Sequence, residues 1–186
     1  ARGLADLETA SPLTTRSVFD IASVTKQFTA TAILLLETDG ALEMSDTLAV
    51  HVEGLPDWAR NITVQELLHH RSGIPDYTAL LTSTGINLAD GATQQDALRT
   101  LRSADLDFAP GERFAYSNSN YIPLAEVVRE VAGVPLPEYL EARIFTPLDL
   151  DMRMDPAFAS TDVATPYERV NDTFVVARSH WGQIGD

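Results

Sequence analysis

The sequence predicts an α/β (α+β) fold that is mostly helical and lacks parts of its sheet. Between residues 23 and 39 no Gly or Pro interrupts a run rich in apolar side chains, and Gly40 follows it, as at the end of a buried helix. Apolar residues spaced along 121–131 and followed by Gly133 predict a second long helix. Only residues 173–177 have the composition of a convincing strand.

Three shorter helices are predicted from their end signals. Thr63 stands three residues before Glu66, and Thr93 stands three residues before Asp96, so each pair indicates a capping box at a helix start. The third helix is expected to begin at Pro137 and to end at Pro147. No further strands are evident, so we expect mostly helices joined by loops and little sheet.

The composition excludes several classes of protein. The chain has 186 residues and a formal net charge of −14, so like-charge repulsion disfavours nucleic acid and anionic membrane surfaces, and we expect neither as a partner. It has no cysteine, which excludes thiolate catalysis and sulfur-ligated zinc. The apolar run at 29–36 is too short to span a bilayer, so we expect no membrane insertion. The oligomeric state stays unknown.

Ser23 and Lys26 stand three residues apart at the start of the first predicted helix. Side chains with this spacing share one helix face, so the Ser23 hydroxyl and the Lys26 amine can meet. A serine hydroxyl becomes a nucleophile when a neighbouring base takes its proton, and a helix start offers free amides to a developing oxyanion. An alternative is a capping serine beside a surface lysine. The pair predicts acyl transfer.

Lys26 is also the only lysine in the chain, in which Lys and Arg together number 13. Arginine keeps its proton at ordinary pH, whereas a desolvated lysine can release it. A sequence that uses arginine at every other cationic position therefore indicates a special role for this one amine.

Tyr116 and Asn118 form a second candidate element, in a loop expected at 108–120. A phenol can exchange protons, and an amide can hold a carbonyl. Sequence spacing does not place this loop relative to Ser23, and a tyrosine packed on a turn with an asparagine cap is the alternative.

These residues resemble the serine β-lactamase and penicillin-binding-protein superfamily, in the branch that holds class C β-lactamases, D-alanyl-D-alanine peptidases and family VIII esterases. Four blocks match in order. They are Phe19-Asp20-Ile21-Ala22-Ser23-Val24-Thr25-Lys26, Leu67-Leu68-His69-His70-Arg71-Ser72-Gly73-Ile74-Pro75, Phe108-Ala109-Pro110-Gly111-Glu112-Arg113-Phe114-Ala115-Tyr116-Ser117-Asn118 and Phe145-Thr146-Pro147-Leu148-Asp149-Leu150-Asp151-Met152. The resemblance implies a β-lactamase/transpeptidase-like fold, and by comparison with it we expect parts of the sheet to be missing, including the early strands that precede the nucleophile helix. We expect residues 1–186 to be a single β-lactamase-related unit, a fragment with the nucleophile helix and the helical lobe.

The resemblance also implies roles for the candidate residues. Ser23 attacks the carbonyl and is acylated, Lys26 relays its proton, and Tyr116 acts as general base and acid. Which of the two bases takes the first proton stays open. Asn118 orients the substrate amide or Lys26. The implied substrates are small esters, β-lactams or peptides, with no cofactor. The implied location is periplasmic or secreted, although no signal peptide is evident, and a cytoplasmic location stays open.

The resemblance breaks at the third motif of the superfamily. Lys-Thr-Gly is excluded because no second lysine exists, and residues 180–182 have only the spelling of its His-x-Gly variant. The alternative function is therefore a catalytically incomplete relative that binds a β-lactam, a peptide or a protein partner. We expect no metal site, because His69 and His70 are adjacent rather than one helical turn apart. His70 is expected to be structural, bonding the loop backbone.

Overall fold

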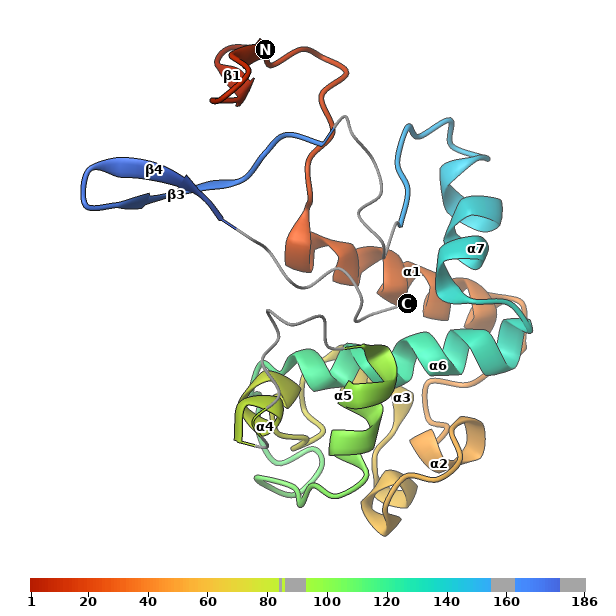
Figure 1. The fold of residues 1–186 in the computed structure, drawn as a ribbon. Helices are drawn as coiled ribbons and strands as arrows, with labels where there is room; N and C mark the ends of the chain where they lie inside the picture. Colours follow the sequence, from red (N-terminus) through yellow and green to blue (C-terminus); the bar gives the residue numbers. More distant parts are fainter. Residues whose placement is uncertain (84, 86–92, 155–162, 178–186) are drawn as a thin grey trace.

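The structure is a computed structural model that describes residues 1–83, 85, 93–154 and 163–177. Its helices pack into one body, and its strands lie above that body in two separate small sheets (Figure 1). The described helical elements are η1 (Ala22–Thr25), α1 (Lys26–Thr38), α2 (Leu48–His51), η2 (Asp57–Asn61), α3 (Val64–Leu68), α4 (Tyr77–Ser83), α5 (Gln94–Leu101), η4 (Asn118–Asn120), α6 (Tyr121–Ala132), α7 (Leu136–Leu140) and η5 (Glu141–Phe145). The described strands are β1 (Leu4–Asp6), β2 (Ser11–Pro12), β3 (Tyr167–Val170) and β4 (Thr173–Val176).

Helix α6 is the centre of the helical body and contacts α1, α2, α3, α5 and α7. Its residues 122–128 are buried, and it ends at Gly133, whose φ of 72° is left-handed and whose N–H donates to the Arg129 carbonyl at 2.9 Å. The prediction of this helix is confirmed. Among the described residues, the buried apolar side chains all lie between residues 32 and 145, so the core is a helical one.

Helix α1 begins later than predicted. Ser23 lies in η1, a 3₁₀ turn, and the α-helix starts at Lys26. Its buried residues are Thr29, Ala32, Ile33 and Leu36, whereas Leu34 is 51% exposed. The helix therefore buries one face against α6 and α7 rather than its whole circumference. The expectation of a buried helix was therefore wrong for the face that carries Leu34.

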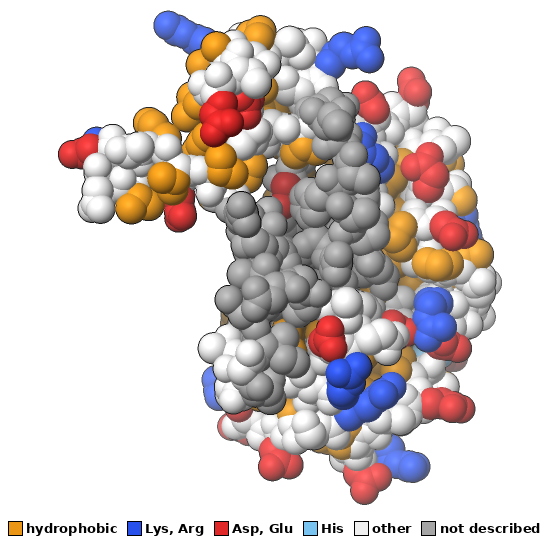
Figure 2. All heavy atoms as spheres, viewed as in Figure 1, with side chains coloured by type: hydrophobic (Ala, Val, Ile, Leu, Met, Phe, Trp, Pro, Cys, Tyr) orange, Lys and Arg blue, Asp and Glu red, His pale blue; other side chains and the backbone are white. Residues whose placement is uncertain are grey.

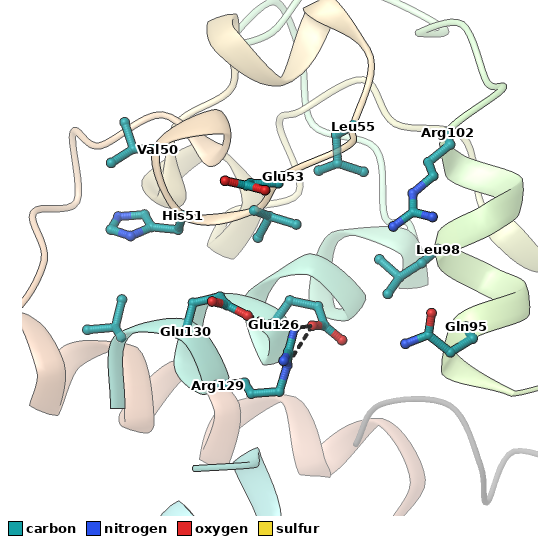
Figure 3. A pocket seen from close by; sticks show the side chains of 12 residues that line it. Val50, His51, Glu53, Leu55, Gln95, Leu98, Arg102, Glu126, Arg129 and Glu130 are labelled. Carbon is teal, nitrogen blue, oxygen red and sulfur yellow. Dashed lines mark hydrogen bonds and ion pairs between the residues drawn. The ribbon is translucent and has the colours of Figure 1, made fainter. Parts of the chain in front are cut away.

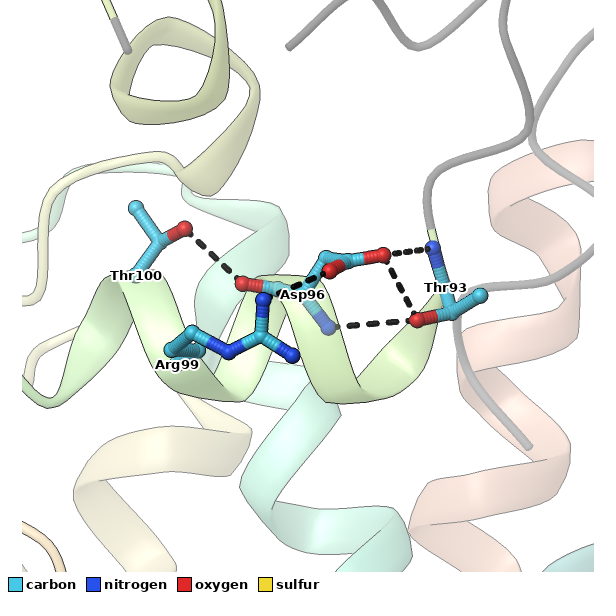
Figure 4. A network of polar contacts seen from close by, with 4 residues as sticks. All are labelled: Thr93, Asp96, Arg99 and Thr100. Carbon is cyan, nitrogen blue, oxygen red and sulfur yellow. Dashed lines mark hydrogen bonds and ion pairs between the residues drawn. The ribbon is translucent and has the colours of Figure 1, made fainter.

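Both predicted capping boxes are confirmed. The Thr63 hydroxyl accepts from the Glu66 N–H at 3.1 Å, and the Glu66 carboxylate accepts from the Thr63 N–H at 2.8 Å, which fixes the start of α3. Thr93 and Asp96 make the same exchange at the start of α5 (Figure 4). Each box satisfies two N–H groups that have no partner within the helix.

The helix predicted from Pro137 to Pro147 is present with a change of geometry. α7 begins at Leu136, and from Glu141 to Phe145 the chain continues as the π-helical turn η5. Phe145 packs edge-to-face on Phe28 of α1, with ring centroids 5.4 Å apart. The wider π-helical turn η5 therefore lies where this part of the chain packs on α1.

The predicted strand is confirmed as β4, which pairs antiparallel with β3 so that Tyr167 faces Val176. The expectation of no early strands was wrong, because β1 and β2 pair before residue 23, although they are only three and two residues long. The Thr165 N–H donates to the Ala5 carbonyl at 2.8 Å, which joins the first residues to the segment before β3. Figure 2 shows hydrophobic side chains exposed on the β3–β4 arm.

Gly73 sits where two loops of the helical body meet. Its φ is +81°, and a Cβ added there would lie 2.1 Å from the Phe108 carbonyl oxygen. The Asp107 N–H donates to the Gly73 carbonyl at 2.9 Å, so the approach is held by a hydrogen bond. No residue with a side chain fits this position without moving the loop that carries Tyr116.

We expect Gly73→Ala to lower the free energy of unfolding by about 3 kcal/mol, because it adds a clash with backbone to the cost of the left-handed φ. Gly40→Ala is the matched control, since Gly40 has a φ of +72° and open space around its missing Cβ. It should cost only about 1 kcal/mol. Urea unfolding measures both values, and equal losses would contradict the close approach at Gly73.

Candidate active site

Ser23 and Lys26 are brought together by the 3₁₀ turn that precedes α1. In a 3₁₀ helix, side chains three residues apart eclipse, and here the Lys26 Nζ donates to the Ser23 Oγ at 3.2 Å. Ala22, just before the serine, has a left-handed φ of 45°, and its N–H donates to the Asp20 carboxylate at 2.7 Å. The chain therefore turns sharply into the site, as it does at many functional positions. Ser23 is exposed, whereas Lys26 is half-buried.

The loop at 108–120 places Tyr116 and Asn118 against this pair. The Tyr116 phenol lies 2.9 Å from the Ser23 Oγ, although the two residues are 93 positions apart. The Asn118 Oδ1 accepts from the Lys26 Nζ at 2.9 Å and from the Tyr116 hydroxyl at 3.1 Å. All four residues predicted from the sequence thus form one hydrogen-bonded cluster.

The packing of α1 on α6 explains why the two segments meet. Lys26 is the first residue of α1, and Asn118 opens the turn η4 that leads directly into α6. Since the two helices are in contact, their first turns bring Ser23 and Tyr116 together. The site is therefore built on the helical body, and the described strands contribute none of the four side chains.

His70 supports the loop that carries Tyr116. Its carbonyl accepts from the Ala115 N–H at 2.9 Å, and its Nδ1 accepts from the Ser117 N–H at 3.3 Å. Its ring packs on the Tyr116 ring with centroids 4.5 Å apart. The expectation that His70 is structural and bonds loop backbone is confirmed.

Two buried side chains that the sequence reasoning missed complete this support. The Asn120 Nδ2 donates to the Ser117 carbonyl at 3.0 Å and lies 3.2 Å from the His70 Nδ1. The Ser72 hydroxyl donates to the Asn120 Oδ1 at 2.5 Å. Neither position carried a signal beyond a turn, because a polar residue beside Gly73 or next to a loop is ordinary in sequence.

Electrostatics in the cluster favour proton exchange at Tyr116. Burial acts to raise the pKa of the Tyr116 phenol, but the Lys26 ammonium and the Ser23 hydroxyl beside it lower that pKa more, so it lies below the ordinary value of 10.0. The Lys26 Nζ also lies 5.3 Å from the centroid of the Tyr116 ring. A phenol with a lowered pKa is a better general base near neutral pH than an ordinary tyrosine.

The described residues offer no alternative centre. Within the described ranges, no group of three or more His, Cys, Asp or Glu side chains could hold a metal ion. A cavity of about 530 Å³ lies between α2, α5 and α6 (Figure 3), and it contains none of the four clustered residues. Its buried acid, Glu126, is held by Arg129 at 2.6 Å and by Gln94 at 3.1 Å, so that carboxylate is already satisfied. Residues 180–182, the variant spelling of the third motif, lie outside the described residues.

The described fold carries a site of one class: a serine hydroxyl within hydrogen-bond distance of a lysine amine and a tyrosine phenol. A model of the Beta-lactamase family matches residues 1–179. The chain belongs to this family, and its fold matches part of the solved structures of penicillin-binding proteins and their homologues.

Three relatives illustrate the match. Penicillin-binding protein 4* of Bacillus subtilis (strain 168) is 32% identical over 80% of this chain and 33% of its own length. A D-aminopeptidase of Brucella anthropi is 34% identical over 100% of this chain and 36% of its own length. The structure of EstCE1, a hydrolase with promiscuous acyltransferase activity, has a TM-score of 0.80 and 27% identity over 95% of this chain and 49% of its own. The chain thus spans about a third of the length of these two curated relatives.

No helix in the described part of the chain is long and apolar enough to cross a membrane.

His70 gives the site a pH dependence that can be measured. Burial lowers the pKa of the His70 imidazole below 6.5, and the positive charge of Lys26 lowers it further. Protonating Nδ1 would also set that atom against the N–H of Ser117. At pH values between the folded and unfolded pKa, the unfolded chain binds a proton that the folded chain does not, so stability falls as the pH falls below about 6.5.

We expect the unfolding midpoint of the wild type to fall between pH 7.5 and pH 5, and His70→Gln to flatten this slope because it removes the titrating ring. His69→Gln is the matched control, since His69 is the neighbouring histidine and is exposed. It should keep the wild-type slope. Thermal unfolding followed by circular dichroism measures all three, and an unchanged slope in His70→Gln would contradict this account.

Proposed function

We propose that this protein is a serine hydrolase that cleaves an ester or amide through an acyl intermediate on Ser23. One observation carries the proposal: the Ser23 hydroxyl lies within hydrogen-bond distance of the Tyr116 phenol, at 2.9 Å, and of the Lys26 amine, at 3.2 Å. A hydroxyl between two proton-handling groups can be activated without a further base. Membership of the Beta-lactamase family supports the proposal.

The proposed reaction runs in two halves. The Ser23 oxygen attacks the carbonyl carbon while its proton passes to the Lys26–Tyr116 pair, and the negative charge moves to the carbonyl oxygen. The pair then returns the proton to the leaving oxygen or nitrogen, and an acyl ester on Ser23 remains. Water attacks this ester in the second half and releases the acid. Asn118 keeps the two bases in place throughout, because its Oδ1 holds both.

The substrate class we propose is a small ester, β-lactam or peptide amide. The relatives are named as a penicillin-binding protein and a D-aminopeptidase, and one similar structure is named as a hydrolase with acyltransferase activity. These names share the attack of a nucleophile on an acyl carbonyl, which is the chemistry that Ser23 is placed to perform.

Incubation with a fluorophosphonate should add one adduct to the protein, and peptide mapping should place it on Ser23. Ser23→Ala should abolish the adduct, while Ser103→Ala, which removes an exposed hydroxyl on the helical body, should leave it unchanged. Lys26→Ala and Lys26→Arg should both slow labelling by about 100-fold or more, because alanine has no amine and arginine does not release its proton, so neither can relay a proton. Intact-protein mass spectrometry measures the rates.

The opposite result separates enzyme from binding protein. If neither a fluorophosphonate nor a penicillin adds mass, while the penicillin still binds reversibly by calorimetry, then the catalytically incomplete relative is the correct alternative. If Lys26→Ala is labelled at the wild-type rate, Lys26 does not relay the proton of Ser23.

Tyr116→Phe should slow the labelling of Ser23 by about 100-fold, because the ring and its packing on His70 remain while the proton acceptor is lost. Tyr121→Phe is the matched control, since the Tyr121 hydroxyl donates to the Leu68 carbonyl at 3.2 Å and is not bonded to Ser23. It should label within about twofold of the wild type. Equal rates in the two variants would exclude Tyr116 as a base.

A further inference from the structure

Asp76 connects the start of α4 to the proposed site. Its Oδ1 accepts from the Thr78 N–H at 3.0 Å, and its carbonyl accepts from the Ala79 N–H at 3.1 Å, as expected of a residue that caps a helix. Its Oδ2 is used differently. It accepts from the backbone N–H of Asn118 at 2.7 Å and from the side-chain Nδ2 of Asn118 at 2.9 Å.

This second oxygen fixes which way the Asn118 amide faces. The amide lies between a carboxylate, which can only accept, and the Lys26 ammonium, which can only donate. Only one orientation satisfies both neighbours: Nδ2 toward Asp76 and Oδ1 toward Lys26. In that orientation Oδ1 also accepts from the Tyr116 hydroxyl at 3.1 Å.

We propose that Asp76 is a positioning residue for the acylation of Ser23, an inference that rests on the proposed function. It acts through Asn118 and has no contact with the nucleophile among the described hydrogen bonds. By holding Nδ2, Asp76 keeps Oδ1 as the common acceptor for Lys26 and Tyr116. Asn118 therefore orders the Lys26 amine and the Tyr116 phenol through Oδ1, while one of the two N–H groups on its Nδ2 is held by Asp76.

Asp76→Asn separates this role from helix capping. Asparagine caps helices as well as aspartate, so its Oδ1 can still accept from the Thr78 N–H and α4 is kept. Its Nδ2, however, faces the two donors of Asn118, and two donors cannot bond. The Asn118 side-chain amide then gains by turning over, which sets its NH₂ group against the Lys26 ammonium. The Asn118 backbone N–H still faces the new Nδ2 and loses its acceptor.

The first readout is the rate of fluorophosphonate labelling at Ser23. Asp76→Asn should lower the maximal labelling rate about tenfold or more, with the inhibitor concentration at half-maximal rate changed by less than about twofold, because the bases and not the binding surface are displaced. The thermal midpoint should stay within about 3 °C of the wild type. Asp96→Asn is the matched control, an isosteric change of a carboxylate that bonds the start of α5. It should leave the labelling rate unchanged.

The second readout does not depend on activity. Because Lys26 is the only lysine, protein labelled with ¹³C at the lysine Cε gives a single lysine resonance. Asp76→Asn should move this resonance, Asn118→Ala should move it as well, and Asp96→Asn should not. If the wild type fails to label with the fluorophosphonate, the proposed function fails, while this resonance still decides whether Asp76 orders Lys26.

A double-mutant cycle completes the test. If Asp76 acts through Asn118, then Asp76→Asn should change the labelling rate by less than about twofold in the Asn118→Ala background. Independent, multiplying losses would overturn the proposal, as would a lysine resonance that Asp76→Asn leaves in place. If Asp76→Asn lowers the labelling rate and also lowers the thermal midpoint by more than about 3 °C, the role of Asp76 is to cap α4 and not to position Asn118.

Discussion

The hydrogen bond between Lys26 and Asn118 is the interaction on which the rest of the site depends. It joins the first turn of α1 to the turn that opens α6, at 2.9 Å, and it places the one amine of the chain's only lysine beside the Ser23 hydroxyl. Together with the 2.9 Å contact between the Ser23 Oγ and the Tyr116 phenol, it ties the two segments to each other. A charged donor and a neutral amide acceptor make such a bond stronger than an ordinary one.

Three packed segments keep that bond in place. The contact of α1 with α6 sets the distance between the two helix starts. Gly73 packs against the Phe108 carbonyl and so fixes the start of the loop that carries Tyr116. His70 accepts hydrogen bonds from the backbone of the same loop on both sides of Tyr116. The arrangement is therefore set by a buried helical core, and catalysis is proposed at its exposed edge. Rigid support of this kind is what acid–base chemistry needs from a scaffold.

The sequence was sufficient to name the four residues that the structure brings together in one hydrogen-bonded cluster. Ser23 and Lys26 have a spacing with a geometric meaning, and the capping boxes at Thr63 and Thr93 have a local hydrogen-bond logic that does not depend on the rest of the fold. The helix that ends at Gly133 could also be predicted, from the spacing of its apolar residues and the glycine that follows them. Each of these signals acts within one or two turns of chain, which is why each survived in the structure.

The parts that the sequence did not predict depend on contacts across the chain. Helix α4 was missed because its start signal, Asp76 after a proline, stands in a segment of turn-forming residues. Ser23 was expected in an α-helix but lies in a 3₁₀ turn that begins at Ala22, whose φ is left-handed. A left-handed φ is uncommon for alanine, so the sequence does not indicate it. The role of Ser72 and Asn120 depends on burial, which single positions do not reveal. The roles of Ser23, Lys26, Tyr116 and Asn118 remain predictions.

A crystal structure of the protein after reaction with a fluorophosphonate tests the central claim most directly. We predict phosphorus bonded to the Ser23 Oγ, with the Lys26 amine still held by the Asn118 Oδ1 and the Tyr116 phenol still beside Ser23. Phosphorus on another residue, or a Lys26 amine turned away from both Ser23 and Asn118, would contradict the account.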